Sequence, residues 1–274
     1  MLEKGKEYKY LEYKRRVERK AMETVIDVKG LCKTYIVNKY SNNVLRNIDF
    51  TLGAGEFVTI MGPSGSGKST MLYTVSGMDR ATSGEITFLG KNYGEMNDKD
   101  MAKERLLSMG FIFQQMYMMR KLCILDNILL PAFHAGIKER NKVREEAEML
   151  MRRLGIIEIA DNEITEVSGG QLQRACLCRA LINHPKVLFA DEPTGALNSS
   201  SANEVMRELV NVNKEGTSIM MVSHSARVAA ASDRVIYLID GHIEGELELG
   251  KLGNEGEMVE RERKLNKWLM EQGW

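Results

Sequence analysis

The stretch Gly62-Pro63-Ser64-Gly65-Ser66-Gly67-Lys68-Ser69-Thr70 decides the fold of this chain. It follows the apolar run Phe57 to Met61 and leads into Met71-Leu72-Tyr73, so the order is strand, glycine loop, helix. It fits the pattern G-x-x-x-x-G-K-[ST], in which small residues let consecutive backbone N–H groups surround a phosphate at a helix N-terminus. Lys68 would reach the β- and γ-phosphates, and Ser69 would offer its hydroxyl to Mg²⁺. A chance glycine-rich turn is the alternative, and the flanking strand and helix argue against it.

The overall composition is that of an ordinary globular protein. The 274 residues are 43% hydrophobic and 28% charged, enough to bury a substantial core in one large or two small domains. The 38 Lys and Arg residues balance 38 Asp and Glu residues, so no net charge favours a nucleic-acid backbone and we expect no nucleic-acid partner. The 18 Met residues stand out, because Met fills gaps in cores and also forms adaptable docking surfaces.

The cysteines and the apolar runs indicate the compartment. Cys32, Cys123, Cys176 and Cys178 form no C-x-x-C pair, which predicts reduced, structural thiols in a cytosolic protein and no zinc site. No run approaches the roughly 20 apolar residues that a membrane span needs, and the N-terminus is charged where a signal peptide would be apolar. Any membrane role is therefore expected to depend on a partner.

The two ends of the chain differ from its middle. Met1 to Lys20 hold eight basic and four acidic side chains, and residues 1–22 are expected to be an N-terminal extension. It is either a basic, weakly amphipathic helix or a solvated segment, since its apolar residues keep no clean helical period. The tail, residues 249–274, places Leu265, Trp268 and Leu269 on one helical face, which is expected to dock on the same chain.

The segments on both sides of the glycine loop predict antiparallel strands. The runs from Thr24 to Leu31 and from Val44 to Leu52 are rich in branched residues, and the second alternates with period two. A polar loop from Asn38 to Asn43 is expected between them, and Ser83 to Gly90 predicts a further strand. Tyr35 is either a packed aromatic, which periodicity alone favours, or a flat platform for a purine ring.

Helices are predicted in the middle of the chain. The patterns favour helices from Asp98 to Ser108, from Ile124 to Pro131 and from Lys138 to Leu154. A short strand from Gly110 to Gln115 ends in amide side chains. The run from Met116 to Leu122 is apolar without a strict period, so it is either buried or covered by a partner.

A second candidate anion site begins at Ser168. The sequence Ser168-Gly169-Gly170-Gln171 opens a helix that runs to Ile182, with Ser as a natural N-cap and Pro185 after the stop. Backbone N–H groups at such a helix start bind anions. An ordinary capped helix is the alternative for a lone Ser-Gly-Gly.

Two buried strands end in polar side chains. Lys186 to Pro193 is an apolar run with Asp191 and Glu192 at its C-terminal end, and Thr217 to His224 is a second run that ends in His. Such runs are typical of parallel strands covered on both faces, and in open α/β sheets the carboxyl edge carries the ligand site. A hairpin over Asp240-Gly241 follows.

Together these motifs resemble, in their order and spacing, the nucleotide-binding subunit of an ABC transporter, over roughly Glu23 to Glu248. The resemblance implies an α/β fold: a P-loop NTPase (RecA-like) core with an antiparallel β subdomain and an inserted α-helical subdomain at about 115–180. The ATPase domain would span residues 23–248. Phe113-Gln114-Gln115 and Glu192 to Leu197 are similar to the branch of macrolide exporters, lipoprotein-release ATPases and bacitracin or lantibiotic resistance transporters. Ile128 to Pro131 and the Gly-Trp ending lean toward the antimicrobial-peptide group.

The resemblance also implies the role of each site residue. Tyr35 would stack on adenine, Asp191 would hold Mg²⁺ and Gln114 would sense the metal and the attacking water. Glu192 would polarise that water, and His224 would contact the γ-phosphate. The implied ATP contacts are Tyr35, Gly62, Pro63, Ser64, Gly65, Ser66, Gly67, Lys68, Ser69, Thr70, Ser168, Gly169, Gly170 and Gln171; the catalytic group is Glu192, His224, Gln114 and Lys68, and the metal group is Ser69, Gln114 and Asp191.

Two anion sites in one chain fit the head-to-tail homodimer of the family. Ser168 to Gln171 would bind the γ-phosphate of the nucleotide held by the other subunit, so a monomer should hydrolyse ATP poorly. Met116 to Leu122 lies, in the family, beside the groove for a cytoplasmic helix of the integral membrane permease, which implies a peripheral position at the cytoplasmic face of the membrane. One departure is Asn198, where the family usually has Asp, and communication between the two sites could change there.

These motifs leave three functions to consider. The first is an ATP-hydrolysing subunit that drives a permease for an antimicrobial peptide, a lipopeptide or a macrolide-like molecule. The second is a regulatory ATPase of the cell-division type, which activates a membrane partner and transports nothing. The third is a soluble ABC protein acting on ribosomes or DNA, which would call for two fused cassettes or a long coiled-coil insertion, and the sequence has neither.

Overall fold

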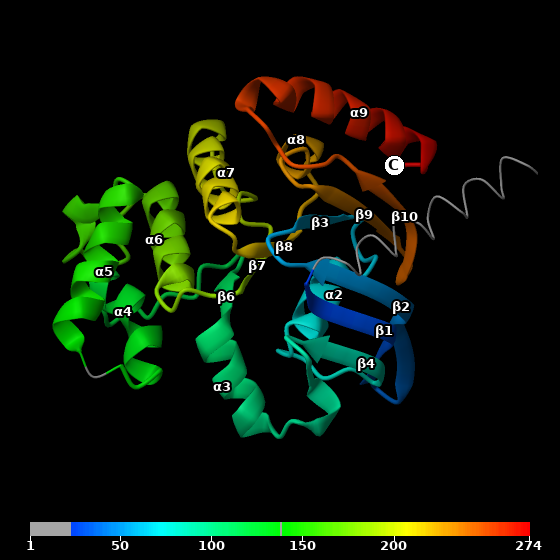
Figure 1. Ribbon diagram of the computed structural model, residues 1–274, viewed down its shortest axis with the longest axis horizontal. Helices are drawn as coiled ribbons and strands as arrows, with labels where there is room; N and C mark the ends of the chain where they lie inside the picture. The colour runs from blue at the N-terminus through cyan, green and yellow to red at the C-terminus, as the bar shows by residue number, and fades with distance from the viewer. Residues whose placement is uncertain (1–22, 138) are drawn as a thin grey trace, which may run out of the picture.

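Two β-sheets organise the protein. The computed structural model describes residues 23–137 and 139–274, so the expected extension at residues 1–22 lies outside the described residues. A six-stranded sheet has the order β10-β9-β3-β8-β7-β6, and a four-stranded antiparallel sheet has the order β2-β1-β4-β5. Figure 1 shows the smaller sheet at one end of the larger one and a group of helices, α4 to α6, at the other.

The larger sheet is parallel except at one edge. Its parallel strands are β3 (Phe57–Met61), β6 (Met109–Ile112), β7 (Val187–Asp191), β8 (Ser218–Val222) and β9 (Arg234–Ile239). The edge strand β10 (His242–Glu248) pairs antiparallel with β9 across the expected Asp240-Gly241 turn. Successive residues of β7 pack into two different cores, Phe189 on one face and Leu188 on the other. Burial on both faces explains why these strands read as continuous apolar runs.

Helices cover both faces of this sheet. The helices of the described residues are α2 (Lys68–Val75), α3 (Asp98–Ser108), α4 (Ile124–His134), α5 (Arg140–Arg153), α6 (Gly169–Leu181), α7 (Ser199–Lys214), α8 (Ala226–Ala229) and α9 (Met258–Glu271), with 3₁₀ turns at Tyr93–Glu95, Ile157–Ile159 and Glu255–Glu257. The three helices expected from the periodicity are α3, α4 and α5. Leu125 of α4, Met151 of α5 and Leu177 of α6 are buried in one cluster. The predicted α/β fold with an inserted helical subdomain is confirmed.

The smaller sheet departs from the expected strand boundaries. It contains β1 (Thr24–Val37), β2 (Tyr40–Gly53), β4 (Ser83–Phe88) and β5 (Lys91–Asn92). The polar loop expected from Asn38 to Asn43 is wrong, because only Asn38 and Lys39 form the turn and Tyr35 already pairs with Asn42. Strand β6 also ends at Ile112, so Gln114 follows the strand instead of lying in it. In both places backbone pairing, which hydrophobic alternation does not record, fixes the boundary.

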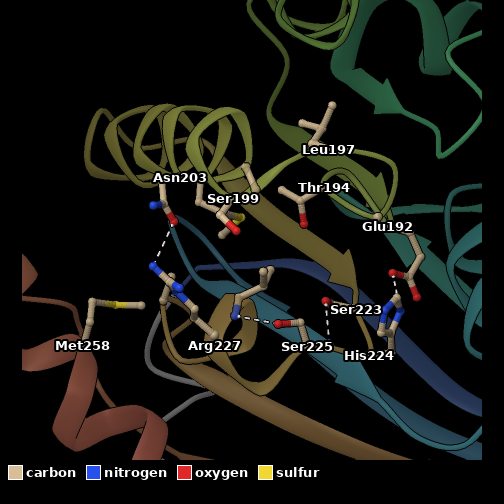
Figure 2. A pocket seen from close by; sticks show the side chains of 15 residues that line it. Glu192, Thr194, Leu197, Ser199, Asn203, Ser223, His224, Ser225, Arg227 and Met258 are labelled. Carbon is tan, nitrogen blue, oxygen red and sulfur yellow. Dashed lines mark hydrogen bonds and ion pairs between the residues drawn. The ribbon is translucent and has the colours of Figure 1, made fainter. Parts of the chain in front are cut away.

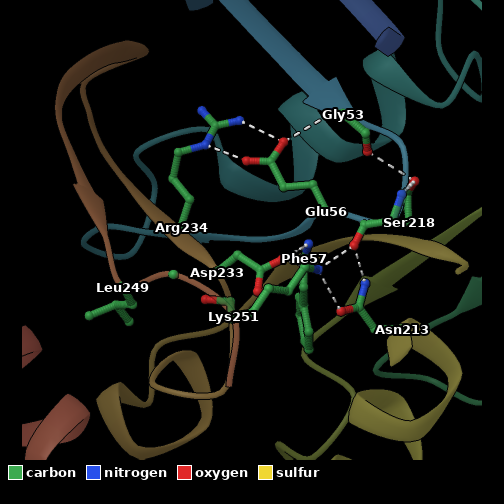
Figure 3. A network of polar contacts seen from close by, with 12 residues as sticks. Gly53, Glu56, Phe57, Asn213, Ser218, Asp233, Arg234, Leu249 and Lys251 are labelled. Atoms are coloured by element: carbon green, nitrogen blue, oxygen red, sulfur yellow. Dashed lines mark hydrogen bonds and ion pairs between the residues drawn. The ribbon is translucent and has the colours of Figure 1, made fainter. Parts of the chain in front are cut away.

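A buried ionic network joins the two sheets (Figure 3). Arg234, at the start of β9, is 1% exposed and donates to Glu56 Oε1 at 2.8 Å, to Glu56 Oε2 at 3.2 Å and to the carbonyl oxygen of Thr51 in β2 at 2.6 Å. Its remaining nitrogen donates to Glu246 Oε2 at 3.0 Å. A buried guanidinium with four acceptors is held in one geometry. The antiparallel sheet is therefore fixed relative to β3 and to the glycine loop from Gly62 to Thr70, named the phosphate loop.

The C-terminal helix docks on its own chain, as its periodicity predicts. Leu265 and Leu269 of α9 are fully buried against Tyr237 of β9, and the Trp268 ring meets the Tyr237 ring at 6.2 Å. Figure 1 shows α9 lying along β9 and β10 beside α8. Arg261 fastens the helix further by donating to backbone carbonyl oxygens, among them those of Ala230 and Ser232. Within the described part of the chain, no helix combines the length and the apolar character that crossing a membrane requires.

Candidate active site

The larger sheet brings the predicted catalytic residues to one edge. Strands β3, β8, β7 and β6 are parallel neighbours, so their carboxyl ends lie side by side. In that order they lead into the phosphate loop, His224, Asp191 with Glu192, and Gln114. Residues that are far apart in sequence therefore lie next to one another at the carboxyl edge of the sheet. This is the edge where open α/β sheets bind ligands.

The phosphate loop has a backbone that requires glycine at two positions. Gly67 caps α2 with φ 101°, and a Cβ there would lie 2.9 Å from the carbonyl oxygen of Val44. A Cβ on Gly62 would lie 2.0 Å from the carbonyl oxygen of Leu238. No side chain caps α2, so its first N–H groups face the loop without a side-chain partner. This is the arrangement of an anion site at a helix N-terminus.

Two side chains of the loop fit a bound phosphate. The Lys68 ammonium donates to the carbonyl oxygens of Gly62 and Pro63 at 2.8 and 2.7 Å. Burial lowers the pKa of Lys68, and the nearby charges of Glu192 and Asp191 oppose that shift. The Ser66 hydroxyl is buried, and it has no hydrogen-bond partner among residues 23–137 and 139–274. A phosphate in the loop would give both groups an anionic acceptor.

Asp191 is held by two hydroxyl groups from α2. Ser69 Oγ donates to Asp191 Oδ1 at 2.9 Å, and the Tyr73 hydroxyl donates to Asp191 Oδ2 at 2.6 Å. Burial and the hydrogen bond to Asp191 raise the pKa of Tyr73, so the phenol keeps its proton. Serine and carboxylate oxygens are the hard ligands that Mg²⁺ prefers, and Mg²⁺ takes few of them because it keeps its waters. The Ser69 and Asp191 pair therefore fits Mg²⁺.

Larger metal-ligand sets do not occur in the described part of the chain. No group of three or more His, Cys, Asp or Glu side chains there is arranged to hold an ion. Cys32, Cys123, Cys176 and Cys178 are free thiols, as the sequence predicts.

Glu192 and His224 form a second pair beside Asp191. His224 Nδ1 lies 2.7 Å from Glu192 Oε2, and Glu192 adopts φ 49°. A left-handed conformation costs a non-glycine residue roughly 1–2 kcal/mol, and here the Glu192 N–H is fixed by the carbonyl oxygen of Val222 at 3.0 Å. Figure 2 shows the pair at one side of a pocket of about 260 Å³. The pocket is also lined by Thr194, Leu197, Asn203, Arg227 and Met258.

Gln114 lies at the same sheet edge and forms no hydrogen bond with these pairs. Its side chain is exposed and, among the described residues, has no hydrogen-bond partner. The preceding residue, Phe113, packs against Phe111 and Tyr117 with ring centroids 5.9 and 5.3 Å apart. The aromatic side chain thus anchors the backbone, while the amide stays available at the edge.

The second candidate anion site begins at a capped helix start, and the predicted N-cap at Ser168 is present. Ser168 Oγ accepts from the Gln171 N–H at 3.3 Å, and Gln171 Oε1 accepts from the Ser168 N–H at 3.0 Å. Ser168 and Gly169 are exposed. A Cβ on Gly170 would lie 2.5 Å from Ser201 Oγ, so a glycine lets α6 approach α7 at this point. The site consists of an exposed helix N-terminus whose polar side chains bond mainly to each other.

Comparison with known proteins agrees with this geometry. The family model described as ABC transporter matches residues 45–195. The chain belongs to the ABC transporter family. The ATP-binding protein YknY of Bacillus subtilis is 37% identical over 219 residues, 80% of this chain and 95% of YknY. The macrolide export ATP-binding/permease protein MacB of Escherichia coli is 40% identical over 222 residues, 81% of this chain and 34% of MacB.

Solved structures lead to the same family. The dimeric bacterial ABC transporter cassette MJ0796 is 35% identical, with a TM-score of 0.78 over 83% of this chain and 100% of that one. A second structure of MJ0796, a dimer in a post-hydrolysis state with ADP and Pi, has the same TM-score at 34% identity. The chain is thus an ABC ATPase, homologous to the MacB-type ATPases, and the recognition made from its motifs is confirmed. It spans about a third of the length of the MacB proteins.

Tyr35 of this ABC ATPase is an exposed and fixed aromatic ring. Its side chain is 37% exposed, its hydroxyl donates to Asp79 Oδ2 at 2.5 Å, and the Lys33 ammonium lies 4.6 Å from the ring centroid. Burial and the hydrogen bond to Asp79 raise the pKa of Tyr35 to about 12, so the phenol is neutral. The exposed ring does not fit the packed core residue that periodicity favours, and its use as a platform for a purine stays a prediction.

Sequence reasoning missed two residues that hold this ABC ATPase site together. Tyr73 supports Asp191, and only its spacing of four residues from Ser69 could have indicated it. Arg179 of α6 donates to the carbonyl oxygens of Met116 and Tyr117, both at 2.8 Å. The run Met116 to Leu122 lies at the surface, with Tyr117 64% exposed, so the alternative of a fully buried segment is wrong.

Proposed function

We propose that the chain is the ATP-hydrolysing subunit of an exporter: ATP joins two copies of it, and hydrolysis drives a separate membrane permease. The single observation that supports this best is the convergence of the phosphate loop, Asp191, Glu192 and His224 at one sheet edge. Phosphoryl transfer needs positioning and charge stabilisation more than covalent chemistry, and these side chains supply both.

The phosphates of ATP are assigned to the loop from Gly62 to Thr70. Its backbone N–H groups and the Lys68 ammonium would replace their present internal contacts with phosphate oxygens, and Ser66 would gain a partner. Ser69 and Asp191 would hold Mg²⁺, with Gln114 approaching from the end of β6. When bound, Mg²⁺ supplies neutralisation of the charge on the β- and γ-phosphates. The exposed ring of Tyr35 would stack on the adenine.

Glu192 and His224 are assigned to the hydrolytic step. The Glu192 carboxylate would orient and polarise the attacking water, and the backbone of Glu192 is already fixed for this by its bond to Val222. His224, 66% exposed and paired with Glu192, would turn one ring nitrogen toward the γ-phosphate. The pair would offer a base and a hydrogen-bond donor next to each other beside the reacting phosphate.

We assign the second anion-binding surface of each copy to the nucleotide that the other copy holds. Ser168 to Gln171 form an exposed helix N-terminus in which the side chains of Ser168 and Gln171 each accept from the backbone N–H of the other. In a head-to-tail dimer each copy would present this helix start to the γ-phosphate held by the other. The dimers described for MJ0796 support this arrangement. Asn198 N-caps α7 through the Ser201 N–H at 2.9 Å, so the loop before α7 is ordered without the carboxylate expected there.

We assign contact with the permease to the surface formed by Met116 to Leu122. Tyr117 and Met119 are 64% and 54% exposed there, and Met side chains make adaptable contacts. The MacB relatives are described as ATP-binding/permease proteins, which supports a permease as the partner of this ATPase. The chain would then sit peripherally at the cytoplasmic face of the membrane, with no nucleic-acid partner.

The proposed cargo is an antimicrobial peptide, a lipopeptide or a macrolide-like molecule. The relatives with a described role are macrolide exporters, which favours transport over the cell-division alternative. In the native host, replacing Glu192 by Gln should sensitise cells to the exported compound. Growth tests with peptides and macrolides identify the class, and unchanged resistance to all of them would contradict export.

Glu192→Gln tests the ATP-driven dimer directly. The amide keeps the shape and leaves the loop untouched, so the variant should bind ATP, lose hydrolysis by about 10²- to 10⁴-fold and accumulate as a dimer. Light scattering with saturating ATP and Mg²⁺ measures this. The matched control is Glu145→Gln on the exposed face of α5, which should hydrolyse ATP as the wild type does. A Glu192→Gln protein that stays monomeric would overturn the proposed mechanism.

A further inference from the structure

Both carboxylate oxygens of Asp191 are bound by the same helix. Ser69 Oγ donates to Oδ1 at 2.9 Å and the Tyr73 hydroxyl donates to Oδ2 at 2.6 Å. Residues four apart lie on one face of a helix, so α2 presents both donors to Asp191 at once. Asp191 is 6% exposed, and the orientation of its carboxylate is therefore set by these two bonds more than by water.

The ring of Tyr73 is itself held in place by other aromatic rings. The ring of Phe113 lies 6.3 Å from it at an interplanar angle of 49°. Phe113 is in turn stacked on Phe111 at 5.9 Å, and Phe111 on Phe189 of β7 at 5.5 Å. Aromatic pairs at such distances are stabilising. The hydroxyl of Tyr73 is thus presented to Asp191 by a ring that packs against Phe113.

We propose that Tyr73 is a positioning residue for the metal: its hydroxyl fixes the Asp191 carboxylate so that Oδ1 and Ser69 face the ion together. The inference rests on the proposed function, in which Ser69 and Asp191 hold Mg²⁺. The bond from Tyr73 reaches the oxygen that Ser69 does not use, so it can persist when the Ser69 hydroxyl turns to the metal. Outer partners of metal ligands act in this way by removing the freedom that the ligand would otherwise lose on binding.

Tyr73→Phe tests this role, because it removes one hydroxyl and keeps the ring against Phe113. The matched control is Tyr93→Phe, since the Tyr93 hydroxyl is buried and has no hydrogen-bond partner among the described residues. The probe is the non-hydrolysable ATP analogue AMP-PNP. Isothermal titration calorimetry measures the dissociation constant of AMP-PNP, first in EDTA and then at increasing Mg²⁺ concentrations. The result is the Mg²⁺ concentration at which half of the total gain in AMP-PNP affinity is reached.

We expect Tyr73→Phe to raise that Mg²⁺ concentration by about 10- to 100-fold, the usual effect of losing an outer partner of a metal ligand. Its AMP-PNP affinity in EDTA should stay close to that of the wild type, while its unfolding midpoint without ligands should fall modestly, because the buried Asp191 carboxylate loses a donor. Tyr93→Phe should match the wild type in all three measurements. A purely structural Tyr73 would instead weaken AMP-PNP binding in EDTA as well as in Mg²⁺.

The outcomes separate this inference from the proposed function. If Mg²⁺ strengthens AMP-PNP binding to the wild type and to Tyr73→Phe at the same concentration, the positioning role is overturned and the metal site stands. Equal weakening with and without Mg²⁺ would also overturn it. If Mg²⁺ fails to strengthen binding to the wild type, the metal site of the proposed function falls, and the inference falls with it.

Discussion

Removing the buried guanidinium of Arg234 should strongly destabilise the protein. Arg234 is 1% exposed and donates two hydrogen bonds to Glu56, one to Thr51 and one to Glu246. In Arg234→Met the Glu56 carboxylate, only 9% exposed, would keep the Gly53 N–H at 2.9 Å and lose its counter-charge. Breaking one side of a buried ion pair costs about 3–5 kcal/mol, and we expect a loss in that range.

The double variant Arg234→Met/Glu56→Met decides what causes the loss. With both charges gone and two apolar side chains of similar length in place, most of the lost stability should return, because buried ion pairs are often no better than apolar packing. Lys142→Met, which breaks an exposed pair with Glu139, is the surface control and should cost less than about 1 kcal/mol.

Urea unfolding at pH 7 measures the free energy of unfolding of the wild type and of four variants. These are Arg234→Met, Glu56→Met, the double variant and the surface control Lys142→Met. The reasoning is refuted if Arg234→Met loses less than about 1 kcal/mol. It is also refuted if the losses of Arg234→Met and Glu56→Met simply add in the double variant, since a shared network requires a coupling of about 0.5–3 kcal/mol between its members.

Two further predictions concern the nucleotide. Lys68→Ala should abolish ATP binding in calorimetry, because the loop loses the ammonium that now donates to Gly62 and Pro63, and retained micromolar affinity would count against the loop assignment. Tyr35→Ala should weaken ATP binding by roughly 5- to 150-fold, since stacking a base on an aromatic ring is worth about 1–3 kcal/mol, whereas Tyr35→Phe should keep most of the affinity; equal losses in both would mean that the ring does not stack.

Local patterns are sufficient to predict the core of the fold. The loop from Gly62 to Thr70 needs glycine because of contacts with Val44 and Leu238, and those needs appear in the sequence as a fixed motif. The apolar runs of β7 and β8 reflect burial on two faces. The rule that ligands bind at the carboxyl edge of such a sheet then leads from these runs to the polar residues that end them, Asp191, Glu192 and His224.

The parts that could not be predicted depend on partners that are distant in sequence. Tyr73 and Asp191 are 118 residues apart, and Arg179 is 62 residues from Tyr117, so neither contact leaves a local pattern. The strand from Tyr40 to Asn43 has polar, exposed side chains and is a strand only because its backbone pairs with β1. Hydrophobic periodicity indicates which face of a segment is buried. It does not indicate a structure that depends on backbone pairing or on a single long-range hydrogen bond.

The two helices that begin at candidate anion sites both hold the segment that follows β6. Helix α2 starts at the phosphate loop and carries Tyr73, whose ring touches Phe113. Helix α6 starts at Ser168 and carries Arg179, which donates to the carbonyl oxygens of Met116 and Tyr117. In the proposed dimer these helix starts face different nucleotides. The surface that we assign to the permease is therefore attached to both helices, and we expect a shift of one helix relative to the other to displace it.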